Sequence, residues 1–326
     1  MSSHNETVDD ETFVRLFESI GPSALARRIG CTMRPVYGRR ARLEKKLRRK
    51  LIAPKDTRLL MREGPEHPVR QHLHIKDGEV LVASDAHFWP GERSTAFRAF
   101  VQFCRDRKQR LRAVIMNGDE LDGATISRHA PIGWEKRPSL IEEIDACKDR
   151  LGEIEKVIGG ACPLIWSLGN HDARFATRLA HVAPEYARVH GTQLKDHFPF
   201  WRPCWSVWIN NDVVIKHRFK GGTHATRNNA LNSGKTMVTG HLHSLKVTPL
   251  TDYSGTRYGV DTGTLLEPGF EGSWGSQVVN YLEDSPVDWR AGFALLTFKD
   301  GRLLWPEVIH AFAPGKVEFR GEVYDV

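Results

Sequence analysis

The chain has 326 residues, of which 40% are hydrophobic and 27% charged, so it is long enough to bury a substantial core in one or two domains. Its apolar runs fall short of the ~18 residues that a membrane span needs. Its polar N-terminus lacks the basic start and apolar core of a signal peptide. Five cysteines without paired spacing are typical of free thiols in the cytosol. We therefore expect a cytoplasmic protein that does not bind a membrane.

The net charge of +7 is confined to the N-terminal segment. Residues 1–60 contain 14 Lys and Arg residues against 7 Asp and Glu residues, whereas the rest of the chain contains 33 of each kind. Such asymmetry indicates a small module that faces a polyanion, attached to a neutral body.

Three short helices are predicted in the N-terminal segment. Apolar residues recur at helical spacing over 11–20, which a Gly-Pro pair closes, and a second helix is expected over 23–29. A third, strongly basic helix is expected from residue 33 to about residue 51. From 52 to 74, three prolines and mixed charges predict a linker.

The spacing of Ala26, Gly30 and Val36 resembles the helix-turn-helix of DNA-binding proteins. The resemblance implies that a small Ala lets two helices approach, that Gly makes the turn, and that the third helix enters the major groove. The residues that this helix would offer to DNA are Arg34, Tyr37, Arg39 and Arg40. The alternative is a helical hairpin whose basic face is solvated or serves oligomerisation. We therefore expect residues 1–51 to form a basic module, with nucleic acid, DNA above all, as its partner.

Strands and helices alternate in the first half of residues 75–326. Apolar runs at 80–83, 113–116 and 162–166 predict buried strands, separated by helices from Ser94 and from Ser139. Later strands follow one another with short connections. They are expected at 207–209, 213–215, 236–239, 258–262, 293–298 and 303–309. This order predicts an α/β fold with a mixed sheet or a two-sheet sandwich and helices outside.

Five of the predicted strands end in residues that commonly bind metal ions. These residues are Asp85, His87, Asp119, Asn170, His171, His217, His241 and His243. Oxygen and nitrogen ligands without thiolate suit Mn²⁺, Fe or Zn²⁺. Even without His171, the seven other residues exceed the need of one ion with an open position. Two ions ~3.5–4 Å apart would bind both the attacking and the leaving oxygen of an in-line phosphoryl displacement.

The motifs Asp85-x-His87, Gly118-Asp119-x-x-Asp122, Gly169-Asn170-His171-Asp172, His217 and Gly240-His241-x-His243 resemble the calcineurin-like metallophosphoesterase superfamily. The resemblance implies a four-layer α/β/β/α sandwich with two divalent cations, Mn²⁺ first and Fe, Zn²⁺ or Mg²⁺ as alternatives. One ion would be held by Asp85, His87, Asp119 and His243, and the other by Asp119, Asn170, His217 and His241. His171 would act as general acid, oriented by Asp122. His224 is a rival for His217, which is preferred because it directly follows a strand.

Several nearby residues permit two interpretations. Protein phosphatases of this superfamily place an Arg directly after the second Asp of Gly-Asp-x-x-Asp, but this chain has Gly123 there. Arg128 and His129 would contact phosphate in its place, or belong to the loop surface. The aromatic run 198–205 would stack bases or lie in the core. Trp274 and Trp289 would line the site.

A basic module joined to a dimetal phosphoesterase favours a phosphodiesterase or nuclease that acts on DNA, through attack of metal-bound hydroxide on phosphorus. The combination also resembles phage-encoded and prophage-encoded metallophosphoesterases. One alternative is a small-molecule phosphodiesterase or phosphomonoesterase whose N-terminal helices are a docking or oligomerisation arm. Another is a DNA-binding regulator with an inactive catalytic body. The choice between DNA and RNA and the oligomeric state stay open at this point.

Overall fold

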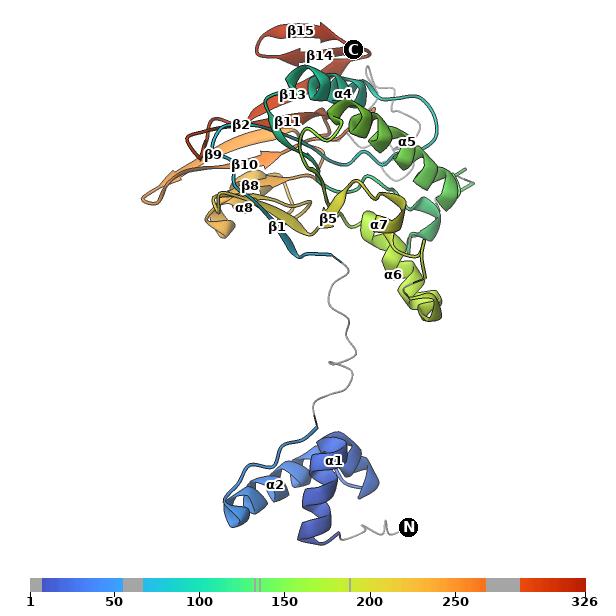
Figure 1. Cartoon of the computed structure of the whole chain (residues 1–326), viewed down its shortest axis with the longest axis vertical. Helices are drawn as coiled ribbons and strands as arrows, with labels where there is room; N and C mark the ends of the chain where they lie inside the picture. Colours follow the sequence, from blue (N-terminus) through green and yellow to red (C-terminus); the bar gives the residue numbers. More distant parts are fainter. Residues whose placement is uncertain (1–7, 55–66, 132, 135, 188, 268–287) are drawn as a thin grey trace. The chain divides into compact units, whose positions relative to one another are not determined.

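The computed structural model divides into two compact units, Met1–Glu66 and His67–Val326. The structure describes residues 8–54, 67–131, 133–134, 136–187, 189–267 and 288–326 (Figure 1). Each unit has a hydrophobic core of its own.

The N-terminal unit contains the helices α1 (Asp10–Arg28) and α2 (Met33–Leu47). Gly21, with φ 75° and ψ 170°, breaks α1 into two helical segments, as the Gly-Pro pair predicts. The basic helix ends four residues earlier than expected, because Arg48 adopts the left-handed conformation with φ 51° and ψ 30°.

The three residues of the helix-turn-helix pattern take the structural parts that the sequence predicts. Ala26 and Val36 are buried at 4% and 1% exposure and pack in one core with aromatic residues of α1. Gly30 makes the turn with a φ of 70°, a value that glycine adopts at little cost. The segment is therefore helix-turn-helix-like in geometry, which does not by itself show what it binds.

The larger unit is built on two sheets. Among the described residues, nine strands form the first sheet, in the order β15 (Glu322–Asp325), β14 (Lys316–Phe319), β13 (Glu307–Ala313), β11 (Ala291–Lys299), β2 (Gly78–Ala83), β3 (Leu111–Met116), β4 (Leu164–Ser167) and β5 (Arg202–Cys204), with β12 (Arg302–Leu303) paired to β11. Six strands form the second, in the order β1 (Arg70–Leu73), β6 (Ser206–Ile209), β7 (Val213–Ile215), β8 (Thr236–Thr239), β10 (Gly255–Asp261) and β9 (Lys246–Asp252).

The strand β1 lies inside the segment 52–74 that was expected to be a linker throughout. It pairs in parallel with β6, from Arg70 against Ser206 to Leu73 against Ile209. Its side chains are half-buried or exposed, so this edge strand has no apolar alternation that would distinguish it from a loop. The linker expectation is wrong for these four residues.

Side chains of the central strands alternate between two cores. On β2, Leu81 and Ala83 join the core beneath the outer helices, whereas Val80 and Val82 join the core between the sheets. A strand that is buried on both faces has a continuous apolar sequence, which is why the run at 80–83 predicts it.

Helices cover the outer faces of both sheets (Figure 1). The helices α4 (Thr95–Arg107) and α5 (Leu140–Ile158) pack on the nine-stranded sheet, and α5 begins with the capping box predicted at Ser139 and Glu142. The helix α8 (Ala225–Ser233) packs against β8, β9 and β10. The chain therefore has the predicted four layers, helix, sheet, sheet and helix.

The remaining helices are α6 (Asp172–Val182), α7 (Leu194–His197) and the 3-10 turns η1 (Ala124–Ile126) and η2 (Pro184–Tyr186). None of the helices in the described part of the chain is both long and apolar enough to cross a membrane. All five cysteines are free thiols.

Candidate metal centre

The predicted ligands follow the carboxyl ends of neighbouring strands in both sheets. The strands β2, β3 and β4 run in parallel, and so do β7 and β8. The loops that follow the parallel strands of one sheet therefore begin at the same edge of that sheet. Asp85 and His87 follow β2, Asp119 follows β3, Asn170 and His171 follow β4, His217 follows β7, and His241 and His243 follow β8.

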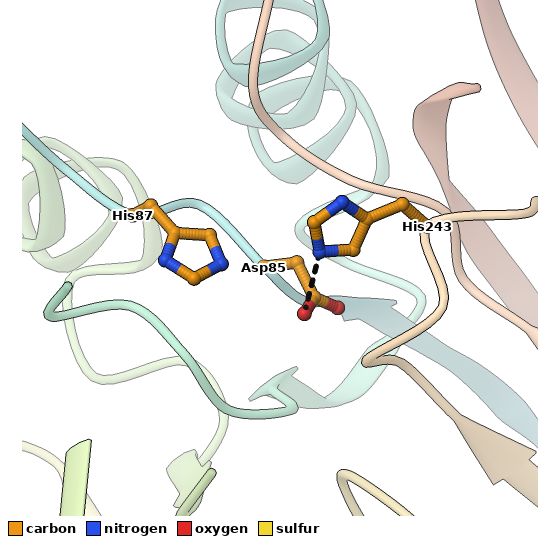
Figure 2. Close-up of side chains that lie close together, drawn as sticks. All are labelled: Asp85, His87 and His243. Carbon is orange, nitrogen blue, oxygen red and sulfur yellow. Dashed lines mark hydrogen bonds and ion pairs between the residues drawn. The ribbon is translucent and has the colours of Figure 1, made fainter. Parts of the chain in front are cut away.

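The first cluster consists of Asp85, His87 and His243. One ligand atom of each lies within 4.8 Å of those of the other two. His243 Nε2 is 3.1 Å from Asp85 Oδ1, and Figure 2 shows the two imidazoles on either side of that carboxylate. Loops from two different sheets therefore supply one candidate cation site.

The second cluster consists of Asp119, His217 and His241, again with ligand atoms within 4.8 Å of one another. His217 Nε2 lies 3.0 Å from Asp119 Oδ2, while Nδ1 lies 2.8 Å from the carbonyl of Asn117. That carbonyl can only accept, so it fixes the proton on Nδ1 and leaves Nε2 for a cation. The rival His224 is exposed at the start of α8 and belongs to none of the ligand clusters among the described residues.

Asp119 also lies with His87 and His171 in a third such group. It is therefore near residues of both clusters, as a bridging carboxylate would be. Three buried polar atoms of the predicted ligands have no hydrogen-bond partner among the described residues, namely Asn170 Oδ1, His217 Nε2 and His243 Nδ1. Buried polar atoms are rarely left unpaired, so this donor set fits cations held between the clusters.

The carboxylates and imidazoles of the centre shift one another's pKa. Burial raises the pKa of Asp119, but the adjacent imidazole of His217 prevails and lowers it to about 2. Burial lowers the pKa of His217, and Asp85 and Asp119 together raise it to about 9. Burial likewise lowers the pKa of His87, which Asp122 raises to about 8. An imidazole that binds a cation must be neutral. A bound cation would therefore displace the proton from each of these imidazoles.

Five of the seven predicted ligands have a left-handed backbone, which costs a non-glycine residue about 1–3 kcal/mol. They are Asp85 (φ 55°), His87 (φ 41°), Asp119 (φ 57°), His241 (φ 72°) and His243 (φ 57°). Such strain persists only where the surroundings fix the conformation, and it is concentrated here on the residues with ligand chemistry.

Two motif glycines allow the loops to approach. A Cβ atom on Gly169 would overlap Asp119 Oδ1, and a Cβ atom on Gly240 would overlap Ser84 Oγ and Asp85 Oδ2. These glycines are required by the packing of the loops around the carboxylates.

Asp172, the last residue of the Gly169-Asn170-His171-Asp172 motif, has a structural role that the sequence did not predict. Its buried carboxylate accepts hydrogen bonds from the backbone N–H groups of Asp119, Glu120, Leu121 and Gly169 and from Trp166 Nε1. It thereby joins the loop after β3 to the loop after β4.

The predicted pair of His171 and Asp122 is formed. His171 Nδ1 lies 2.7 Å from Asp122 Oδ1 and 3.0 Å from the Asp122 carbonyl. Burial raises the pKa of Asp122, but the hydrogen bond with His171 prevails, so the pKa lies below its ordinary value. Two acceptors at Nδ1 place the proton there and leave Nε2 toward the cluster.

Arg174 is a second residue that the sequence did not reveal. Its Nη1 donates to the Asp122 carbonyl at 2.9 Å, and its Nη2 donates to His171 Nε2 at 3.0 Å. A Cβ atom on Gly123 would lie 3.4 Å from Arg174 Cδ. The side chain of Arg174, from α6, therefore lies beside Gly123, the residue directly after the second Asp of the Gly-Asp-x-x-Asp motif.

A cavity of about 720 Å³ lies beside the second cluster. Asn170 and His217 line it together with Arg128 and His129, the two predicted phosphate contacts, which are exposed. At the first cluster, the ring of Trp289 lies 4.2 Å from that of His243, centroid to centroid. Trp274 lies outside the described residues.

The four predicted DNA contacts divide into two pairs. Arg34 and Tyr37 are exposed on α2. Arg39 instead pairs with Asp10 at 2.9 Å and lies over the ring of Phe13. Arg40 pairs with Glu44 at 3.0 Å. Arg42 and Lys45 are further exposed cations on α2.

No protein-family model matches the chain. The gene 54 protein of Mycobacterium phage L5 is 25% identical over 271 residues, which are 76% of this chain and 98% of that protein. Vps29 of Chaetomium thermophilum aligns over 76% of this chain and 97% of its own, with a TM-score of 0.38 and 10% identity. A protein serine/threonine phosphatase of Saccharomyces cerevisiae, described as similar to human phosphatase PP5, aligns over 76% and 85%, with a TM-score of 0.36 and 12% identity. At these TM-scores, neither alignment supports an inference about function.

Proposed function

We propose that the chain is a dinuclear, metal-dependent phosphoester hydrolase of the calcineurin-like metallophosphoesterase superfamily. The observation that carries the proposal is the pair of Asp-His clusters with Asp119 between them. The order and spacing of the motifs match the superfamily pattern, and the four-layer architecture agrees with it.

Two cations fit this centre. Asp85, His87, Asp119 and His243 would hold one, and Asp119, Asn170, His217 and His241 the other. When bound, the ions would supply Lewis-acid stabilisation of the phosphoryl oxygens and a water of lowered pKa. Mn²⁺ is our first candidate, with Fe, Zn²⁺ and Mg²⁺ as alternatives.

The residues around the cations have separate tasks in the proposed reaction. Asp122 fixes the tautomer and orientation of His171, at 2.7 Å. His171 Nε2 would deliver the proton to the leaving oxygen. Arg174 would bind a non-bridging phosphate oxygen, the task that the Arg of related phosphatases performs from the position of Gly123.

We further propose that the substrate is nucleic acid, with DNA favoured, and that the enzyme is a phosphodiesterase or nuclease. The N-terminal unit supports this proposal, because Arg34, Arg42 and Lys45 are exposed on the second helix of a helix-turn-helix-like arrangement. The similarity to a phage protein agrees with an enzyme of viral origin.

The test is hydrolysis, with Mn²⁺, of single-stranded and double-stranded DNA beside bis-p-nitrophenyl phosphate and p-nitrophenyl phosphate. DNA cleavage that is absent in His171→Ala supports the nuclease. The triple variant Arg34→Ala/Arg42→Ala/Lys45→Ala should then lose activity on long duplexes. A triple variant in the larger unit, Arg98→Ala/Lys148→Ala/Arg302→Ala, is the control for lost positive charge.

One observation favours a second candidate, a small-molecule phosphodiesterase or phosphomonoesterase with a docking arm. Arg39 and Arg40, two of the four predicted DNA contacts, are engaged within the N-terminal unit itself. Turnover of the small esters without cleavage of any nucleic acid would establish that candidate.

A further inference from the structure

The cavity beside the second cluster has an unbalanced positive charge. Five cations line it, Arg128, Arg174, Arg178, Lys216 and Arg218, and among the described residues no carboxylate lines it. Its volume of about 720 Å³ falls in the range of ligand-binding pockets, about 300–1,000 Å³.

Three separate segments deliver these cations to one place. Arg174 and Arg178 are four residues apart on α6, so they lie on the same helix face. Lys216 and Arg218 flank the predicted ligand His217 in the chain after β7. Arg128 comes from the loop after η1.

Most of these cations are not neutralised inside the protein. Within the described part of the chain, neither Arg178 nor Arg218 forms an ion pair, hydrogen bond or ring contact, and both are exposed. Among the described residues, the one hydrogen bond of Arg128 is to its neighbour His129, at 3.4 Å. Lys216 lies over the ring of Phe219, with Nζ 5.5 Å from the centroid. Burial, and then the charge of Arg218, lowers the pKa of Lys216.

An aromatic side chain also lines the cavity. Trp205, at 41% exposure, lines the cavity on the side of the strand β6. An exposed indole beside arginines is the combination on which unpaired bases stack. A duplex has its bases stacked inside and offers none to Trp205.

We propose that this cavity binds the phosphates next to the scissile one, and an unstacked base, of a single-stranded nucleic acid. Arg174 serves the scissile phosphate, Arg178, Lys216 and Arg218 serve its neighbours, and Trp205 stacks the base. That these phosphates belong to the substrate rests on the proposed phosphoesterase function. A monoester carries one phosphate and would leave most of the cavity's cations without a partner.

The test begins with binding in the absence of chemistry. Fluorescein-labelled hexathymidylate is titrated with the full-length chain in EDTA and followed by anisotropy at several salt concentrations. In Arg178→Ala/Arg218→Ala, we expect the Kd to rise at least about 10-fold and the slope of log Kd against log salt to fall by about 1.4, which corresponds to two lost phosphate contacts. Trp205→Ala should raise the Kd about 5–150-fold. Arg98→Ala/Arg302→Ala, which removes two exposed positive charges outside the cavity, is the matched control.

Turnover then tests the link to the metal centre. With Mn²⁺, the ratio of kcat/KM for hexathymidylate to that for bis-p-nitrophenyl phosphate should fall at least about 10-fold in Arg178→Ala/Arg218→Ala and recover largely in Arg178→Lys/Arg218→Lys. An unchanged Kd and salt slope would overturn the proposal. So would an unchanged turnover ratio, or competition by inorganic phosphate or thymidine triphosphate as effective as that by the hexamer.

The two proposals fail in different ways. If the wild type shows no metal-dependent turnover of hexathymidylate, bis-p-nitrophenyl phosphate or p-nitrophenyl phosphate, the hydrolase function fails, whatever the binding of the hexamer shows. If that turnover is present but the Kd for the hexamer is unchanged in Arg178→Ala/Arg218→Ala, only the cavity proposal fails.

Discussion

Arg174 Nη2 lies 3.0 Å from Nε2 of His171, and the other ring nitrogen, Nδ1, lies 2.7 Å from Asp122 Oδ1. A guanidinium only donates hydrogen bonds and a carboxylate only accepts them, so these contacts make Nδ1 the donor and Nε2 the acceptor of the ring. To deliver a proton from Nε2, His171 must first be released by Arg174. A substrate phosphate, which attracts the guanidinium, would release it. Substrate binding and the protonation of the general acid are thus linked through one side chain.

Replacement of Arg174 tests this link. In Arg174→Ala, a charge-assisted hydrogen bond to phosphate is lost, and we expect kcat/KM for a phosphodiester to fall about 10–100-fold. Arg174→Lys should recover only part of it, because an ammonium lacks the planar fork that reaches both Asp122 and His171. Steady-state kinetics with Arg98→Ala as control measures both. Wild-type kinetics in Arg174→Ala would contradict this role.

The acid role of His171 predicts a dependence on the leaving group. An alkoxide needs a proton to leave, whereas p-nitrophenolate is a weak base and leaves without one. In His171→Ala, kcat should fall by about 10²–10⁴ for an alkyl or nucleoside ester and far less for a p-nitrophenyl ester. The metal content of the variant should stay at that of the wild type. Equal losses for both esters would show that His171 acts otherwise, as a ligand for example.

Asp172→Asn should destabilise the protein strongly. The carboxylate accepts from five N–H groups, and an amide replaces one acceptor oxygen by an NH₂ group that faces these donors. We expect a loss of about 3 kcal/mol or more in the free energy of unfolding, measured by urea denaturation in EDTA. Asp145→Asn, at an exposed position on α5, is the control. A loss below about 1 kcal/mol would mean that the loops do not depend on this carboxylate.

Glu143 predicts a pH-dependent stability. Its carboxylate accepts from the backbone N–H groups of Gly123 and Ala124. Burial, and then the charge of Asp122, raises its pKa to about 7, above the value of about 4.3 in an unfolded chain. The folded state therefore binds more protons between these values. The stabilisation is complete below about pH 4.3 and is lost as the pH rises through about 7.

Comparison with Glu143→Gln isolates this contribution. Both proteins contain the same buried histidines, so those contributions cancel in the difference. Between about pH 5 and 7, the free energy of unfolding of the wild type should fall relative to that of the variant, by up to about 1.4 kcal/mol per pH unit. Urea denaturation in EDTA at several pH values measures it. Parallel curves would show that Glu143 keeps an ordinary pKa.

The sequence predicts the residues of the centre because each lies where a continuous apolar run ends. Such runs mark strands buried on both faces, and the carboxyl ends of parallel strands meet at one edge. The sequence therefore predicts that Asp85 and Asp119 lie close together. The Gly-Pro pair predicts the break at Gly21, and the helix-turn-helix resemblance implies the close packing at Ala26.

Features that depend on contacts distant in sequence were missed. The donors to Asp172 include backbone groups about fifty positions away, which no side-chain pattern records. Arg174, on the helix α6, contacts His171 beside Gly123, which has no Cβ atom. The helix α8 buries Thr226 and Asn229 and has no apolar stripe, and β1 is a polar edge strand. The local hydrophobic periodicity of the sequence does not indicate any of these features.

The central claim is that two cations at the Asp-His clusters activate phosphoester hydrolysis. The most direct measurement is a titration of chelator-treated protein with Mn²⁺, in which bound metal and turnover of bis-p-nitrophenyl phosphate are recorded together, for the wild type and for Asp119→Asn. We expect no turnover without metal, full turnover at about two bound ions, and at least about a 10³-fold loss in the variant together with weaker binding of both ions. Turnover in the chelator-treated protein, or an Asp119→Asn variant that binds two ions and turns over like the wild type, would contradict the account.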